Sequence, residues 1–276
     1  MAGRLMGRLL RAEVRKTFST KLWWALLVPV ALLSIVINLF GGLFAAAIPN
    51  KGAGLPLLLG SLAYALGLTG VFAACYGVVA MAAEFRHRTI TTTYLTEPRR
   101  GRVLLAKMAT SAAVGALYAA VVALVGVLAG LAGQGGAAPA VDQLLAVSAI
   151  GMAVAALWSA LGSALGTVIS NQVSGLVGIL VYLLLGELLI SALLNSANSE
   201  AVPRLTAYLP GNAGDVAIYD IPAHVLAGSD LGPTVVETLA GVTAPPPWWG
   251  ALLVLAAWVA AVAAAGWVVG ARRDVT

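Results

Sequence analysis

Long runs of uncharged, mostly apolar residues dominate the chain, and the charged residues lie almost entirely between them. The five longest runs cover 22–50, 52–83, 108–141, 143–186 and 238–271. A helix needs roughly 20 residues to cross the hydrocarbon core of a membrane, which is about 30 Å thick. Four of these runs therefore predict one membrane-spanning helix each.

The run at 143–186 is too long for one span, because a helix rises only about 1.5 Å per residue. It continues apolar to Leu194 and contains one polar tripeptide, at 170–172, which we interpret as a tight turn between two spans. The pattern predicts an all-α polytopic membrane protein, a single transmembrane domain over 1–276. Its six helices are expected near 22–47, 55–83, 103–131, 143–169, 173–195 and 249–270.

Composition agrees with this interpretation. The chain is 61% hydrophobic and only 10% charged, with a mean hydropathy of +0.95. Roughly a quarter of the residues of a soluble domain are charged, so a soluble enzyme is excluded. The single cysteine, Cys75, excludes an intramolecular disulfide.

The basic residues predict the orientation of the chain. Of the 16 Lys and Arg residues, all but Lys51 and Arg204 precede the first span, separate the second from the third, or follow the sixth. The positive-inside rule makes that side cytoplasmic, with both termini inside and 196–248 outside. The net charge of +5 is therefore a topology signal, and nucleic-acid binding loses its only support.

Residues 3–20 predict a helix that lies on the cytoplasmic membrane surface. Arginines recur along one stripe, at Arg4, Arg8, Arg11 and Arg15, with leucines largely opposite. Trp23 and Trp24 mark the headgroup level at the start of the first span. A frayed basic tail is the alternative. A cleaved signal peptide is disfavoured, because the first apolar run far exceeds the 7–15 residues or so of a signal sequence.

The sequence lacks the residues needed for ATP hydrolysis at a phosphate-binding loop and for a metal site shared by its two histidines. A phosphate-binding loop needs Gly-Lys followed by Ser or Thr, and none of the four lysines follows a glycine. His87 and His224 are predicted on opposite sides of the membrane, so they cannot share a metal. We expect no enzyme activity, no metal site and no cofactor in this chain.

Glu187 is the one ionisable residue well inside a predicted span. A carboxylate within a membrane is costly and usually faces a bundle interior, a cavity or a partner. Glu187 is therefore a candidate for the translocation path. The alternatives place it at the outer headgroups, or protonated and hydrogen-bonded to Ser191.

The layout resembles the permease subunits of ABC-2 type ABC transporters, in particular the actinobacterial members, over the whole chain. The residues that carry the resemblance are Glu13-x-x-Lys16 with Thr17 and Lys21, Glu84-x-Arg86-x-x-Thr89, Thr96-x-Pro98-Arg99-Arg100, Ala106-Lys107, and the closing Arg272-Arg273-Asp274-Val275. The likeness lies in their order and spacing together with six spans.

The resemblance implies a function for the segments between the spans. Residues 84–102 correspond to the family's coupling loop, 3–20 to its elbow helix and 196–248 to its outer cap. The expected ATPase-coupling residues are Glu84, Arg86, Arg88, Thr89, Pro98, Arg99 and Arg100. Glu187 has no counterpart in a known family role.

The same resemblance implies the partners. A separate ATPase subunit, in two copies, is expected to hold the ATP and magnesium, and a second permease chain is expected to complete a homodimer. Export of an amphipathic cargo (drug, lipid or peptide) across a bacterial cell membrane follows as the expected activity. The alternative is a membrane protein that needs no ATPase, either a secondary transporter or an immunity or scaffold protein.

Overall fold

The computed structural model describes residues 2–47, 57–87, 89, 99–133 and 138–272, and side chains from Met6 to Gly270. These residues form helices joined by short turns, and no strand occurs among them. Six helices in this part of the chain are long and apolar enough to cross a membrane, which confirms the six predicted spans. Five are continuous: α2 Leu22–Ala47, α3 Leu57–Arg86, α5 Arg100–Gly133, α6 Val141–Ile169 and α10 Trp248–Arg272.

The remaining span, Gln172–Asn195, changes its helical geometry along its length. It consists of α7 Gln172–Val181, a π-helical turn η1 Tyr182–Gly186, and α8 Glu187–Asn195. The predicted turn at 170–172 separates α6 from α7. Ser170 adopts a left-handed conformation (φ 53°) after α6, and the Asn171 side chain accepts hydrogen bonds from two backbone N–H groups of the first turn of α7.

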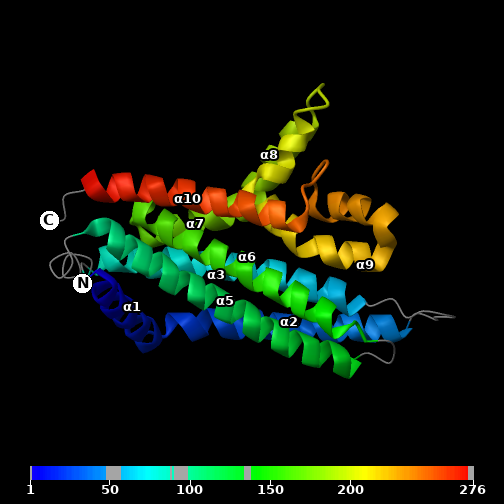
Figure 1. The fold of residues 1–276 in the computed structure, drawn as a ribbon, viewed down its shortest axis with the longest axis horizontal. Coiled ribbons are helices and arrows are strands. Elements are labelled where there is room, and N and C mark those ends of the chain that lie inside the picture. Colours follow the sequence, from blue (N-terminus) through cyan, green and yellow to red (C-terminus); the bar gives the residue numbers. More distant parts are fainter. Residues whose placement is uncertain (1, 48–56, 88, 90–98, 134–137, 273–276) are drawn as a thin grey trace.

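The helix α1, Ala2–Ser19, precedes the first span, as the arginine stripe predicts. In Figure 1, α1 lies at the same end of the bundle as the last turn of α10, and α9 lies towards the opposite end. We call these the α1 end and the α9 end. Because α3 ends and α5 begins at the α1 end (Figure 1), residues 84–87 and 99–102 lie there too.

The segment between the fifth and sixth spans is largely helical. It contains a 3₁₀ helix η2, Pro203–Tyr208, and the 31-residue helix α9, Pro210–Ala240. A break at Gly228 (φ 78°) divides α9, and a residue with a Cβ rarely adopts that conformation. The break lets α9 double back at its end of the bundle (Figure 1).

The centre of the bundle is α3, which packs against α2, α5 and α6. Glycines let the helix backbones approach closely. A Cβ at Gly77 of α3 would stand 2.1 Å from the carbonyl oxygen of Ser159, and one at Gly162 of α6 would stand 2.2 Å from that of Ala74. Such contact suits a membrane bundle, where helices associate by van der Waals packing rather than by the hydrophobic effect. By contrast, α2, the fifth span and α10 expose most of their apolar side chains.

Candidate functional site

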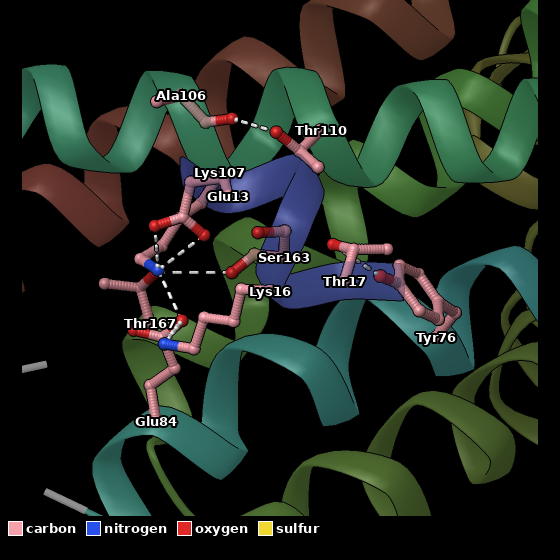
Figure 2. A network of polar contacts seen from close by, with 10 residues as sticks. All are labelled: Glu13, Lys16, Thr17, Tyr76, Glu84, Ala106, Lys107, Thr110, Ser163 and Thr167. Atoms are coloured by element: carbon pink, nitrogen blue, oxygen red, sulfur yellow. Dashed lines mark hydrogen bonds and ion pairs between the residues drawn. The ribbon is translucent and has the colours of Figure 1, made fainter. Parts of the chain in front are cut away.

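A group of charged side chains joins three helices at the α1 end of the bundle. Glu13 and Lys16 are three residues apart on α1, so both point to the same side of that helix. They meet Glu84, near the end of α3, and Lys107, two turns into α5. Figure 2 shows these four side chains converging between the helices; we call them the charge network.

Glu84 is the centre of the charge network. Its Oε1 atom accepts a hydrogen bond from Lys16 Nζ at 2.6 Å and another from Lys107 Nζ. Lys107 Nζ also donates to both carboxylate oxygens of Glu13, at 2.9 and 3.0 Å. The Glu84 and Lys107 side chains are only 7% and 5% exposed, whereas that of Lys16 is 42% exposed.

The charge network is electrically balanced, with two carboxylates and two ammonium groups. Removing buried charges from water is costly, and the cost is offset only when opposite charges and hydrogen bonds satisfy them. Removing one member of a buried ion pair typically destabilises a protein by about 3–5 kcal/mol, because the other charge stays buried without its partner. Each of these helices is therefore fixed to the others through ionised groups.

Further contacts attach α1 and the start of α2 to the bundle. Tyr76 of α3 donates a hydrogen bond to the Thr17 hydroxyl at 3.4 Å, and Tyr118 of α5 donates to the Trp23 carbonyl oxygen at 2.6 Å. The rings of Tyr76 and Tyr118 meet edge to face, with centroids 5.9 Å apart. The α1–α2 corner is thus held against α3 and α5.

A cavity of about 400 Å³ lies beside the charge network. Its wall includes all four charged residues, several threonines and the apolar side chains of Leu22, Val79 and Met81. Two buried polar atoms in this wall, Glu84 Oε2 and Ser163 Oγ, have no hydrogen-bond partner among the residues that the structure describes.

The structure separates Glu84 from the other residues expected to contact an ATPase. Glu84 points into the charge network, while Arg86, Thr89 and Arg99 are exposed at the same end. Arg86 donates to Gln172 Oε1 at 3.4 Å, and Arg100, half-buried, donates to the Gly270 carbonyl oxygen at 2.6 Å. Arg88 and Pro98 lie outside the described residues. The coupling role of all these residues stays a prediction.

The residues expected at the membrane interface lie largely on the surface. The side chains of Arg8, Arg11, Arg15 and Trp24 are exposed, and Trp23 is half-buried against Phe18. The side chain of Arg4 is outside the described part of the chain. Exposed arginines on α1 suit contact with anionic headgroups.

Glu187 caps a helix. Its two carboxylate oxygens accept hydrogen bonds from the backbone N–H groups of Gly211 (3.0 Å) and Asn212 (2.9 Å), in the first turn of α9. These N–H groups have no partner within the helix, and the positive end of the helix dipole also attracts the carboxylate. Ser191 does not pair with Glu187; its hydroxyl accepts instead from the Asn212 side chain at 3.0 Å.

The Glu187 cap borders a second cavity, of about 240 Å³. Asp215, one turn further along α9, lines the same cavity together with Trp158. Burial and, to a smaller extent, repulsion by the Glu187 carboxylate together raise the pKa of Asp215 to about 7. The two carboxylates thus line one small cavity, together with Gly67 and Val71 of α3.

Sequence reasoning did not identify Asn212 or Asp215 as members of this site. The Asn212 amide also donates to the Thr206 carbonyl oxygen at 2.9 Å, so it joins α8, η2 and α9. A signal was present in Pro210-Gly211-Asn212, because proline favours the first turn of a helix. Nothing in that signal indicates which carboxylate caps the helix.

No cluster of three or more His, Cys, Asp or Glu side chains suited to a metal ion occurs in the described ranges. No protein-family model matches the chain, and no curated protein matches it either.

Proposed function

We propose that the chain is the membrane-spanning permease subunit of an ATP-driven transporter of the ABC-2 type. The observation that carries the proposal is the charge network, because it connects α1 with α3 and α5. These two helices flank residues 84–102, the segment proposed to contact an ATPase. A displacement of that segment would move α1, α3 and α5 together.

The proposal assigns ATP and magnesium to a separate ATPase subunit in two copies. It is supported by the lack of a phosphate-binding loop in the sequence and by the exposed basic residues near 84–102, which suit an acidic groove. A second permease chain would complete the complex as a homodimer. The apolar faces of α2, α10 and the fifth span offer surface for lipid or for that second copy.

In the proposed mechanism, ATP binding closes the two ATPase subunits and moves the proposed coupling loops with them. The permease dimer then opens to the outside. The free energy comes from the higher affinity of ATP for the closed state, because a ligand shifts an equilibrium only by binding one state better. Helices rich in Leu, Val and Ala favour an amphipathic cargo over a small polar solute, and export is what the resemblance to ABC-2 transporters implies. The proposed location is the cytoplasmic membrane of a bacterium, with both termini inside.

One observation favours the alternative of a secondary transporter that needs no ATPase. Such transporters require ionisable groups on the translocation path, and the sequence pointed to Glu187 alone. The structure places Asp215 against the same cavity, so this site has two carboxylates. Protonation of such a pair would couple transport to a proton gradient.

The test is to purify the tagged chain from its native membrane and to measure ATP hydrolysis. We expect an ATPase with a phosphate-binding loop to co-purify in equimolar amount. Glu84→Gln unbalances the charge network and should reduce the co-purified ATPase or its activity on the order of tenfold. The control, Glu200→Gln, changes an exposed carboxylate beyond the end of α8 and should leave both unchanged. The proposal would be contradicted if the chain alone, in liposomes and without ATP, took up protons in response to an imposed ion gradient.

A further inference from the structure

The cavity beside the charge network has two deeply buried polar side-chain atoms in its wall. Ser163 is 1% exposed, and its Oγ atom has no hydrogen-bond partner among the described residues. The same holds for the Oε2 atom of Glu84, whose side chain is 7% exposed. Buried polar atoms in proteins are nearly always hydrogen-bonded, so these two atoms indicate a ligand that brings N–H or O–H donors.

The charges around the cavity restrict the ligand further. Lys107 already contacts Glu13 and Glu84, whereas Lys16 pairs with Glu84 alone among the described residues and is 42% exposed. The cavity therefore offers a carboxylate oxygen to a positive group and the Lys16 ammonium to a negative group. Because the charge network is neutral as a whole, a zwitterion fits the cavity better than a simple cation or anion does.

The position of the cavity indicates a lipid. Its wall includes α1, whose exposed arginines suit a membrane surface, and Leu22, where the first span begins. Polar groups and the apolar side chains of Val79 and Met81 share this wall. A molecule that combines a zwitterionic headgroup with apolar chains matches both parts of the wall.

We propose that the cavity binds a phospholipid whose headgroup carries a primary ammonium, such as phosphatidylethanolamine. The ammonium donates hydrogen bonds to Glu84 Oε2 and Ser163 Oγ, and the phosphate lies near Lys16. Phosphatidylcholine has the same charges but no N–H group, so it cannot satisfy either acceptor. Lipid binding at this place holds whether or not the chain works with an ATPase.

The test is native mass spectrometry of the full chain, delipidated and then offered equal amounts of phosphatidylethanolamine and phosphatidylcholine with identical acyl chains. We expect the ethanolamine lipid to be retained about tenfold better, because two hydrogen bonds distinguish the two lipids. Equal retention would overturn the proposal.

Variants locate the binding in this cavity. Ser163→Ala removes one acceptor without changing the charge network and should reduce the preference several-fold, and Glu84→Gln should reduce it too. The control is Ser159→Ala, because Ser159 is equally buried and unpartnered among the described residues but does not line the cavity. A preference unchanged in both Ser163→Ala and Glu84→Gln would contradict the site.

A series of lipids tests the same point without changing the protein. N-methyl and N,N-dimethyl phosphatidylethanolamine keep at least one N–H group, and full methylation removes the last one. The N-methyl headgroup keeps two N–H groups, enough for both acceptors, and the N,N-dimethyl headgroup keeps one. We therefore expect retention to hold at the first methylation and to fall at each of the next two. A decline that follows headgroup size evenly would overturn the hydrogen-bonding argument.

Discussion

At the scale of single residues, Glu187 shows how a costly side chain is accommodated. It is 4% exposed, and its carboxylate satisfies two N–H groups that the first turn of α9 leaves without partners. Gly211 makes this contact possible, since a Cβ there would stand 2.1 Å from Glu187 Oε2. The cap therefore gives Glu187 a structural role, while its place on a translocation path stays a prediction.

Replacing Glu187 by Gln should destabilise the protein. The Gln side chain has one oxygen to accept from Gly211 or Asn212, and its NH₂ group cannot accept from the other N–H group. Loss of one buried hydrogen bond with a charged acceptor costs about 1–3 kcal/mol, so we expect the melting temperature of the purified protein to fall by several degrees.

The matched control is Glu200→Gln. Glu200 is exposed, beyond the end of α8, and its neutralisation should leave the melting temperature unchanged. Equal melting temperatures for wild type and Glu187→Gln would show that Glu187 does not cap α9 in the purified protein.

At the scale of helices, close packing and one irregular turn determine which residues face each other. The π-helical turn η1 precedes Glu187 directly. Such a turn inserts one extra residue and so rotates the following helix by about 100° relative to a regular α-helix. This rotation sets the face of α8 on which Glu187 and Ser191 meet Asn212.

The α3–α6 contact predicts strong effects of small substitutions. Gly162→Ala places a methyl group 2.2 Å from the Ala74 carbonyl oxygen, so the two helix backbones must move apart. We expect a loss of stability of about 1–3 kcal/mol, measured as a lower melting temperature and a lower yield of folded protein. Gly178→Ala is the control, since a Cβ at Gly178 of α7 has no atom within 4 Å. A neutral effect of Gly162→Ala would mean that α3 and α6 are further apart.

At the scale of the whole molecule, the α1 end and the α9 end must lie on opposite sides of the membrane if the six helices span it. The distribution of Lys and Arg predicts that the α1 end is cytoplasmic. Single cysteines in a Cys75→Ala background test this orientation, because Cys75 is the only native cysteine.

Two exposed positions suit the labelling. Asn198 lies beyond α8, and Ser19 ends α1. We expect a membrane-impermeant maleimide added to intact cells to label Asn198→Cys and to leave Ser19→Cys unlabelled until the membrane is opened. Labelling of Ser19→Cys in sealed cells, with Asn198→Cys protected, would invert the predicted topology.

The sequence by itself determined six helices long and apolar enough to span a membrane, the helix before them and the turn at 170–172. Each follows from local composition, because the length of an apolar run sets the number of spans and polar residues interrupt it. Helix bounds deviated by a few residues, as for α5, which begins at Arg100 rather than 103. The orientation of the chain stays a prediction from the distribution of Lys and Arg.

The tertiary structure alone decided which polar side chains meet. Glu84 pairs with Lys16, 68 residues before it, and Lys107 pairs with Glu13 across 94 residues. Spans that are apolar all round carry no periodicity to show which face is inward, so the sequence leaves their rotation open. The hydrogen-bond partners of Glu187 depend on the π-helical turn before it and on the packing of the first turn of α9 against α8. Neither feature has a specific local signal in the sequence. Contacts between distant segments depend on packing, and packing depends on the whole bundle.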